Sequence, residues 1–331
     1  MPEGHTLRRL ARQFGDVFGG QRLAVSSPQG RFAGGAALLD GHVLVAADAH
    51  GKHLFLHFDH SLVLHVHLGL YGAWSFGGDS TFAGSSSIGA PRRVGEQESF
   101  DDGDGGRPYD GPPAPVGAVR VRLAGTNGWA DLRGATTCET ITAAEAEAVL
   151  GRLGPDPLRN RRGDAGRFAA SLQSRTAPLA ALLMDQKVIA GVGNVYRAEV
   201  LFRRRLDPWL PGTEVPDTEA RKLWRDVVSV MSDGVADGRI ITTTPRYWTA
   251  NGTSGNGKAA AGTPVTPGTA AAKPAAASAA VVRADTYPAR EDAHFVYKRN
   301  GLPCRVCRTT VLMAELVGRK LYWCPYCQQS A

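Results

Sequence analysis

Residues 185–201 read Asp-Gln-Lys-Val-Ile-Ala-Gly-Val-Gly-Asn-Val-Tyr-Arg-Ala-Glu-Val-Leu, the most specific structural signal in the chain. The pattern predicts a helix, a glycine-rich turn and a second helix. Gly191 and Gly193 permit backbone to approach a ligand closely, and the amides at the start of the second helix can hold a phosphate. Asn194 can add a side-chain donor. Taken alone, the same residues also fit a simple tight turn between helices.

Helical patterns continue on both sides of this turn. Thr142-Ala143-Ala144-Glu145 is a capping box that starts a helix. Further helices are predicted at residues 167–174, 178–185, 196–204 and 217–237. We therefore expect an all-helical domain over residues 141–248.

The residues before this helical domain predict a mostly β domain over residues 1–140. It opens with an amphipathic helix at residues 3–14, in which Leu7, Leu10 and Phe14 share one face. Short runs predict strands at residues 21–26, 43–47, 53–58, 62–68, 116–123 and 129–132. Residues 76–115 are rich in Gly, Ser, Pro and Asp and nearly free of aliphatic side chains. We expect them to form a long mobile loop inserted between strands.

The residues after the helical domain predict a tether and a metal site. Residues 249–288 are rich in Ala, Gly, Thr, Pro and Ser, a composition that cannot bury enough apolar surface to fold. Residues 289–331 contain Cys304-x2-Cys307-x16-Cys324-x2-Cys327, a spacing that indicates zinc. Because all four expected ligands are cysteines, we expect one structural Zn²⁺ with no open position for chemistry. The whole chain is predicted to be a multidomain α+β protein with a C-terminal zinc ribbon.

The chain begins Met1-Pro2-Glu3-Gly4-His5-Thr6. Methionine before a small residue such as proline is normally trimmed, which leaves the secondary amine of Pro2 at the start of the mature chain. An α-amino group titrates near pH ~8, so a useful fraction is neutral and nucleophilic at cell pH. With the Glu3 carboxylate beside it, this amine suits Schiff-base catalysis. The alternative is an ordinary N-terminus, because Met-Pro-Glu begins many proteins.

Charge and cysteine content narrow the class of protein. The 331 residues carry a net charge of +7, from 38 Lys+Arg and 31 Asp+Glu, which favours a polyanionic partner. Only Cys138 lies outside the two CxxC pairs, so we expect a reduced cytosolic protein without disulfides. No stretch approaches the ~20 apolar residues of a membrane span. No nucleotide or flavin motif is visible, so we expect no small-molecule cofactor.

Four segments together carry a family resemblance: Pro2-Glu3-Gly4-His5-Thr6, Gly51-Lys52-His53, residues 185–201 and the cysteine ribbon. They resemble the formamidopyrimidine-DNA glycosylase / endonuclease VIII family of base-excision repair enzymes, over about residues 1–75, 116–245 and 291–331. The resemblance implies an N-terminal β-sandwich, a helix–two-turn–helix domain and a zinc ribbon. It also implies a monomer that binds damaged double-stranded DNA in the cleft between the domains.

The resemblance implies roles for five residues. Pro2 resembles the nucleophile that attacks C1′ of the damaged nucleotide and forms an iminium ion, which supports β- and δ-elimination. Glu3 resembles the general acid/base. Lys52, which we place with the catalytic residues, resembles the lysine that contacts phosphate near the lesion. Asn194 and Arg319 resemble two further phosphate clamps. Lys52 and Arg319 also fit ordinary solvated surface charges.

A damaged base must leave the double helix before Pro2 can reach C1′, so a side chain must fill the gap. Leu70 and Tyr71, flanked by glycine, resemble such a wedge, with ordinary core residues as the alternative. The Leu-Tyr pair is similar to the endonuclease VIII branch, which implies oxidised pyrimidines and abasic sites as substrates. Gly69 departs from that branch, whose best-known members have a polar wedge residue there.

Three functions remain open from the sequence. The first is a bifunctional DNA glycosylase/AP lyase, in a prokaryote a cytoplasmic protein at the nucleoid. The second is an AP lyase with weak base removal. The third is a non-catalytic DNA-binding relative that recruits partners, although the presence of both Pro2 and Glu3 argues against it. Seven of nine histidines lie between His42 and His67. We favour ordinary strand and phosphate-facing histidines there over a second metal site.

Overall fold

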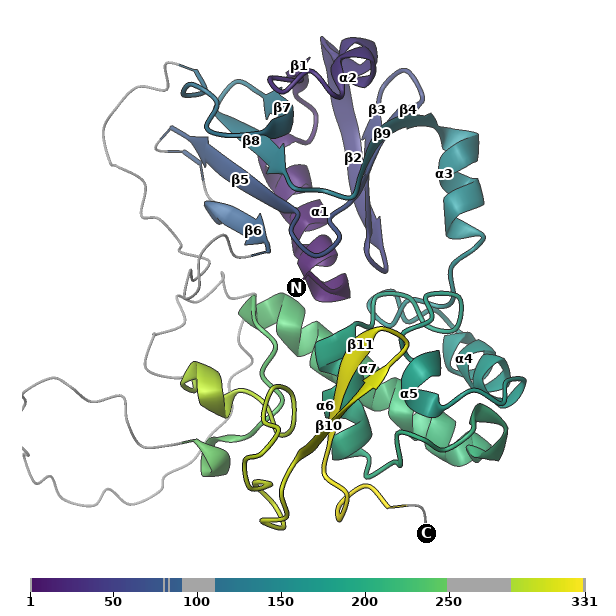
Figure 1. Ribbon diagram of the computed structural model, residues 1–331. Helices are drawn as coiled ribbons and strands as arrows, with labels where there is room; N and C mark the ends of the chain where they lie inside the picture. The colour runs from purple at the N-terminus through teal and green to yellow at the C-terminus, as the bar shows by residue number, and fades with distance from the viewer. Residues whose placement is uncertain (1, 80, 83, 91–110, 249–286, 330–331) are drawn as a thin grey trace, which may run out of the picture.

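The structure, a computed structural model, describes residues 2–79, 81–82, 84–90, 111–248 and 287–329. Figure 1 shows a β-rich part above a helical part, with the start of the chain at their junction. Residues 91–110 of the predicted loop and 249–286 of the predicted tether lie outside the described residues. Within the described residues, no helix is both long and apolar enough to cross a membrane.

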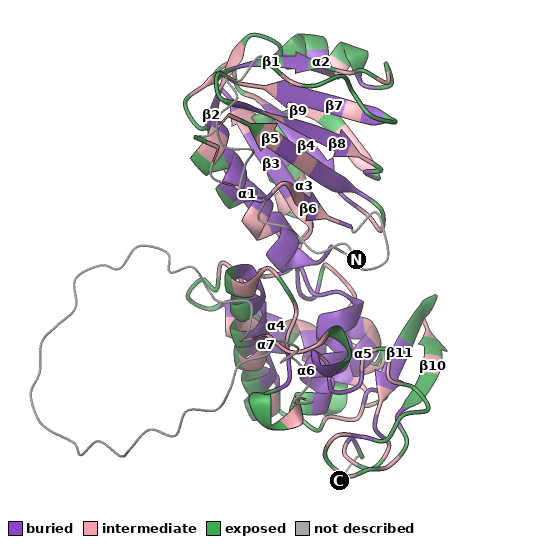
Figure 2. Cartoon of the chain, turned by 90° about the vertical axis from the view of Figure 1, so that its left-hand side faces the viewer, coloured by how far each residue is buried: buried purple, intermediate pink, exposed green. Residues whose placement is uncertain are grey.

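The β-rich part is one antiparallel sheet with the strand order β6-β5-β8-β7-β1-β2-β3-β4-β9. Its strands are β1 (Arg22–Ser26), β2 (His42–His50), β3 (His53–Phe58), β4 (Leu62–His67), β5 (Ala73–Gly78), β6 (Ser87–Gly89), β7 (Val119–Ala124), β8 (Gly128–Arg133) and β9 (Thr137–Thr142). β1 pairs with β2 through its first two residues and with β7 through its last three. The sheet therefore turns over at β1 and forms the two layers of a sandwich (Figures 1 and 2).

Alternation along the strands builds the core between the layers. Leu54 and Leu56 of β3 point inward and share one buried cluster with Leu123 of β7 and Leu132 of β8. Helix α1 (Gly4–Phe18) contributes Leu7, Leu10, Phe14 and Phe18 to the same cluster. Because α1 packs on β2 and β3, the first residues of the chain emerge at the lower end of the sandwich (Figure 2).

The outer face of β3 and β4 carries a second, smaller cluster. Phe55, Val63 and Ile141 pack there against Ala146 of helix α3 (Ala143–Leu150). The predicted capping box of α3 is present: Thr142 and Glu145 bond each other's backbone amides. Helix α2 (Ala33–Leu39) packs beside β1 and β9.

The helical part has its own core. Its helices are α4 (Asp164–Gln173), α5 (Leu179–Leu182), α6 (Asn194–Arg203) and α7 (Asp217–Asp237), with short 3-10 helices η1 (Gly212–Glu214), η2 (Pro245–Tyr247) and η4 (Arg290–Asp292). α6 is buried along almost its whole length. The zinc ribbon forms the hairpin of β10 (Leu312–Leu316) and β11 (Arg319–Trp323), and Leu321 of β11 belongs to the helical core.

The predicted α+β class, with a sandwich, a helical part and a ribbon, is confirmed. The prediction that the mobile loop begins at residue 76 is wrong, because β5 continues to Gly78 and β6 spans Ser87–Gly89. Phe76 and Ile88 are buried in the sandwich core. At the end of the predicted tether, the Tyr287 ring lies 4.7 Å from the guanidinium of Arg239.

Candidate active site and zinc centre

The start of α6 binds the carboxylate of Glu3. Glu3 is fully buried, and its Oε2 and Oε1 accept the backbone amides of Gly193 and Val195, each at 2.8 Å. The amide of Tyr196 lies 3.4 Å from Oε2. The sequence indicates that these amides can hold a phosphate, with a simple tight turn as the alternative. The structure corrects this: the N-terminus of a helix favours any anion, and the chain supplies its own.

Three glycines bring the two parts of the molecule together at this point. Gly4 donates its amide to the carbonyl of Gly191 at 2.8 Å. A Cβ on Gly4 would lie 2.9 Å from the Gly191 Cα, and one on Gly51 would lie 3.0 Å from the Gly191 nitrogen. Gly51 and Gly191 also have positive φ angles, of 57° and 88°. Only glycine fits at these contacts, which place the Lys52 turn and the chain start against the turn before α6.

Burial dominates the electrostatics of the Glu3–Lys52 pair. It raises the pKa of the Glu3 carboxyl, although Lys52 and the three amides act in the opposite direction. Burial also lowers the pKa of the Lys52 ammonium; Glu3 opposes this shift, and Arg319 and Arg197 add to it. The pair therefore combines a carboxyl that holds its proton with an ammonium that gives its proton up more readily than usual.

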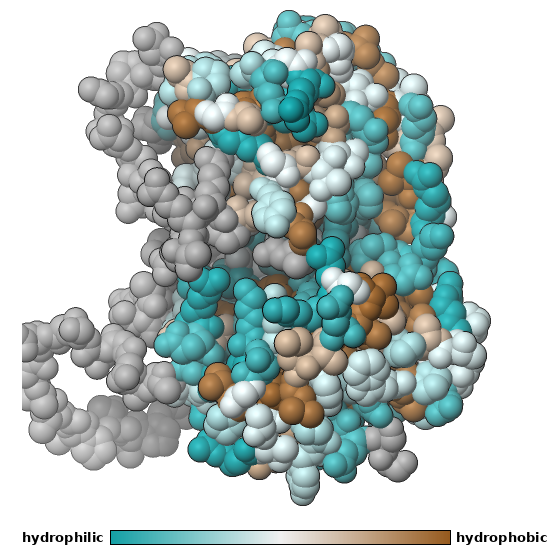
Figure 3. Space-filling view, viewed as in Figure 1, coloured by the Kyte–Doolittle hydropathy of each residue, from teal (hydrophilic) through white to brown (hydrophobic). Residues whose placement is uncertain are grey.

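Several hydrogen-bond donors near Glu3 are free of protein partners. Neither the Lys52 ammonium nor the exposed Arg319 guanidinium makes an ion pair or hydrogen bond within the part of the chain that the structure describes. His67 was not predicted as a site residue. Its Nδ1 accepts the amide of Gly69 at 3.2 Å, so its proton lies on Nε2 and makes this nitrogen a donor. On the face drawn in Figure 3, hydrophilic side chains predominate where the two parts meet.

Asn194 faces inward. It is 6% exposed, its Nδ2 donates to the Lys320 carbonyl at 2.9 Å, and its Oδ1 accepts from Arg197. Arg197 is fully buried and also reaches the Lys320 carbonyl, at 3.2 Å. Both side chains thus fasten β11, the strand that begins with Arg319, to α6.

The predicted wedge residues lie in the turn between β4 and β5. Tyr71 is 81% exposed, so the alternative that it is a core residue is wrong. Leu70 is half-buried. Gly69 has a φ of 65°, and a Cβ there would lie 1.9 Å from the Thr136 hydroxyl oxygen. This steric limit explains why a larger residue is absent at that position.

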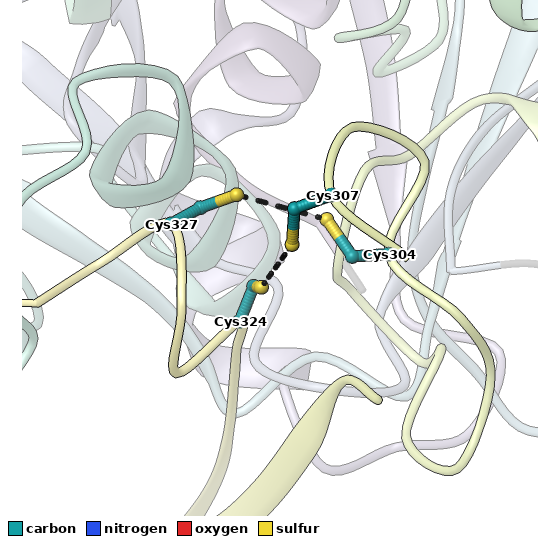
Figure 4. A group of neighbouring side chains, drawn as sticks. All are labelled: Cys304, Cys307, Cys324 and Cys327. Atoms are coloured by element: carbon teal, nitrogen blue, oxygen red, sulfur yellow. Dashed lines mark hydrogen bonds between the residues drawn. The ribbon is translucent and has the colours of Figure 1, made fainter. Parts of the chain in front are cut away.

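The four predicted metal ligands converge (Figure 4). The Sγ atoms of Cys304 and Cys327 are 3.9 Å apart, those of Cys307 and Cys324 are 3.4 Å apart, and all four lie within 4.8 Å of one another. A tetrahedral zinc with Zn–S bonds of ~2.3 Å needs sulfur–sulfur distances near 3.8 Å. The four cysteines therefore fit one structural Zn²⁺.

A second buried carboxylate docks the ribbon on α6. Glu199 is fully buried and accepts the amides of Phe295, Val296 and Tyr297 at 2.8, 2.9 and 2.8 Å. The Thr242 hydroxyl adds a fourth bond. α6 therefore binds the start of the chain through backbone amides and residues 295–297 through the Glu199 side chain.

Known families match the three parts in the same order. Residues 1–128 match the formamidopyrimidine-DNA glycosylase N-terminal domain, residues 153–245 its H2TH domain, and residues 301–329 the zinc finger found in FPG and IleRS. The chain is 40% identical to endonuclease 8 1 of Mycobacterium tuberculosis over 329 residues, 99% of this chain and 100% of the relative. The chain belongs to the formamidopyrimidine-DNA glycosylase / endonuclease VIII family.

Other family members are similar over shorter stretches or in fold. A formamidopyrimidine-DNA glycosylase of Thermus thermophilus is 32% identical over 180 residues, 54% of this chain and 55% of the relative. The crystal structure of MutM (Fpg) from the same species superposes with a TM-score of 0.64 at 24% identity, covering 99% of this chain and 98% of that chain. The Lactococcus lactis Fpg, in complex with DNA containing an abasic site, gives a TM-score of 0.65 at 16% identity, covering 99% of this chain and all of that one.

Proposed function

We propose that the protein is a bifunctional DNA glycosylase and AP lyase of base-excision repair that acts on damaged double-stranded DNA. The observation that carries the proposal is the buried Glu3 carboxyl, which α6 holds next to Pro2 in the chain. An amine with a carboxyl beside it that can give and take a proton is the pair that Schiff-base chemistry needs. The relative named formamidopyrimidine-DNA glycosylase and the Fpg structure with DNA support the same assignment.

Pro2 is the nucleophile in this proposal. Its nitrogen forms a bond to C1′ of the damaged nucleotide, the bond from C1′ to the base breaks, and the base leaves with a proton. Opening of the sugar ring then yields an iminium ion, which has no N–H to lose because the amine is secondary. This ion withdraws electrons, so loss of a C2′ proton expels the 3′ phosphate and a second elimination expels the 5′ phosphate.

Glu3 is the general acid/base. Burial raises the pKa of its carboxyl, so the protonated form persists to higher pH than in an exposed glutamate. The carboxyl can then give its proton to the sugar ring oxygen as the ring opens and recover one later. The three amides of α6 stabilise the carboxylate formed in between.

Phosphates of the DNA bind to the free donors around this pair. Lys52, His67 and Arg319 supply them from the β2–β3 turn, the end of β4 and the start of β11. Asn194, whose amide holds the Lys320 carbonyl, fixes the strand that carries Arg319. Leu70 and the exposed Tyr71 fill the gap left by the extruded base, and oxidised pyrimidines are the preferred lesions.

Borohydride trapping tests this chemistry directly. Full-length, zinc-loaded protein is mixed with duplexes carrying one abasic site or one oxidised thymine. Covalent adducts are expected on both, and they should be lost when Pro2 is replaced or Met1 is retained. An adduct on the abasic site alone would leave an AP lyase with weak base removal. Retained DNA binding without any adduct would identify a non-catalytic relative.

The proposal also includes the state of the protein in the cell. We expect a monomer in the bacterial cytoplasm, associated with the nucleoid DNA. Light scattering after size exclusion, with and without a lesion-containing duplex, measures the stoichiometry. A complex of two chains with one duplex would contradict this part of the proposal.

A further inference from the structure

Three side chains form a hydrogen-bonded chain across the outer face of the sandwich. Nδ1 of His53 on β3 lies 2.8 Å from Nε2 of His65 on β4. Nδ1 of His65 lies 2.8 Å from Oε1 of Glu139 on β9. The chain runs from the residue after Lys52 to a carboxylate that is half exposed. It therefore connects the proposed phosphate site to solvent at β9, the edge strand of the sheet.

The carboxylate determines where the protons lie along this chain. Glu139 only accepts, so Nδ1 of His65 carries a proton and its Nε2 has a lone pair. His53 must then donate from its own Nδ1, which leaves a lone pair on Nε2. This Nε2 makes no hydrogen bond to any residue that the structure describes. In this state the ring presents an acceptor, which would repel a phosphate oxygen.

The surroundings keep His53 itself neutral. Burial lowers its pKa to about 3, and the nearby His67, His65, His50 and Lys52 add to this effect. His65 differs in its contacts, because its Nδ1 is hydrogen-bonded to the Glu139 carboxylate at 2.8 Å, and the two would form an ion pair if the ring gained a second proton. The Phe55 ring stacks on His65 at 4.9 Å, and α3 contributes only the apolar Ala146, Val149 and Leu150 to the adjoining cluster. The groups that face this pair are thus Lys52, His50 and His67, and the hydrogen-bonded anion is Glu139.

We propose that His53 is a further phosphate-contacting residue, and that His65 and Glu139 are positioning residues that convert it from acceptor to donor when DNA binds. One proton is taken up from solvent at Nε2 of His53. The proton on Nδ1 of His53 moves to Nε2 of His65, which then carries two protons and the positive charge beside Glu139. His53 remains neutral and presents Nε2–H to a phosphate at Lys52. This inference rests on the proposed function, because it needs a DNA phosphate at that site.

The test is the pH dependence of DNA binding. Affinity for a duplex with a reduced abasic-site analogue is measured by fluorescence anisotropy between about pH 6 and pH 8.5, the range in which histidine charge changes. Binding coupled to one proton should weaken with rising pH, by at most about tenfold per pH unit. His53→Gln keeps an amide donor but cannot be switched, so its affinity should lose most of the pH dependence. Glu139→Gln should also lose most of the pH dependence, because a neutral amide cannot pair with a doubly protonated His65.

A contact and a merely structural role differ in their salt dependence. His53→Ala should remove the phosphate contact together with the proton that is taken up on binding, and the loss of this one positive charge should reduce the slope of log affinity against log salt by up to about 0.9. His57→Gln, on the same strand and face, is the matched control and should leave both slopes unchanged. Retention of the wild-type pH slope in His53→Gln would overturn the inference, as would a wild-type protein with no pH slope. If either of these results is found, borohydride trapping with the wild-type protein tests the proposed function separately. Covalent adducts would leave the proposed function unchanged, and their absence would contradict it.

Discussion

Two buried carboxylates, Glu3 and Glu199, each join α6 to another segment of the chain, yet their surroundings differ. Glu3 accepts three amides from the start of α6, and Glu199, on α6 itself, accepts three amides from residues 295–297. Both are fully buried. Glu199 also bonds the Thr242 hydroxyl and joins two segments of the protein. Glu3 follows Pro2, the proposed nucleophile, and interacts electrostatically with Lys52.

Burial and amide bonding are common to both carboxylates, so these two features do not distinguish the proposed acid/base from a docking residue. What distinguishes Glu3 is its neighbourhood: Lys52 and Arg319 have no protein anion bonded to them within the described residues. Glu199 instead lies where the ribbon packs on α6, beside Phe202 and Phe295. A buried carboxylate is therefore a candidate for catalysis when free donors and a nucleophile lie beside it, and a docking element when only backbone surrounds it.

Replacement of Glu3 by Gln should give the largest effect. Loss of a general acid/base is expected to slow base release by about 10²- to 10⁴-fold, with DNA binding retained. Single-turnover release of an oxidised base measures it, and Glu147→Gln on exposed α3 is the control. Unchanged base release would remove Glu3 from the mechanism and erase the contrast with Glu199.

Replacement of Glu199 by Ala should act on stability instead. It leaves the three backbone amides of residues 295–297 without an acceptor, which should cost at least about 3 kcal/mol. The ribbon should become sensitive to protease and release zinc more readily to a chelator. Thermal unfolding and zinc release are the measurements, and Glu147→Ala should change stability by less than about 0.5 kcal/mol. A variant as stable as wild type would show that the ribbon docks by other contacts.

Gly193→Ala tests the seat of Glu3 without touching the carboxyl group. The new Cβ would lie 2.5 Å from Cδ of Glu3, so the side chain must move. A displacement of this size should lower the rate by about 10- to 100-fold. In Gly166→Ala, on α4, the new Cβ meets only Arg221 at 3.7 Å, and this control should be slightly more stable and fully active. Equal activity of the two variants would contradict a precise seat.

The pH dependence of stability gives the smallest effect. Burial raises the pKa of Glu3 above its ordinary value of 4.5, so the protonated carboxyl is the form that folding favours. Its contribution is present below pH 4.5 and is lost as pH rises through the folded-state pKa. Glu3→Gln does not titrate, so its melting temperature should rise relative to that of wild type as the pH passes through the folded-state pKa of Glu3. If the melting temperature of Glu3→Gln instead falls relative to wild type as pH rises, the amide hydrogen bonds lower the pKa of Glu3 by more than burial raises it.

The sequence predicted elements best where one periodic pattern was long. The helix at residues 217–237 matches α7, and the alternating runs at 53–58 and 62–68 became β3 and β4. α2 was missed because Gly34 and Gly35 weaken its helical signal. β6 was missed because a three-residue strand among Ser and Gly carries no pattern, although the neighbouring strands bury Ile88.

The sequence named candidate residues of the site, but it did not predict which groups they contact. Motifs identified Pro2, Glu3 and the four cysteines, and the cysteines do converge. No local pattern could reveal that the amides after Gly191 bind Glu3, because that contact spans almost two hundred residues. The role of Arg197 was likewise hidden, since a charged residue in a buried helix is explained only by the carbonyls it meets. His67 was not predicted from the sequence, although it had a usable signal, its place two residues before Gly69.

The bonds between Glu3 and α6 have a consequence for protein synthesis. The residues that hold its carboxyl come 190 to 193 positions later in the chain. Chains emerge from the ribosome N-terminus first, so Pro2, the proposed nucleophile, appears long before the helix that binds Glu3, the proposed acid/base. A half-made or truncated chain thus carries the amine without its partner. In a chain that has not been translated past residue 196, the contacts that hold the proposed acid/base in place are therefore incomplete.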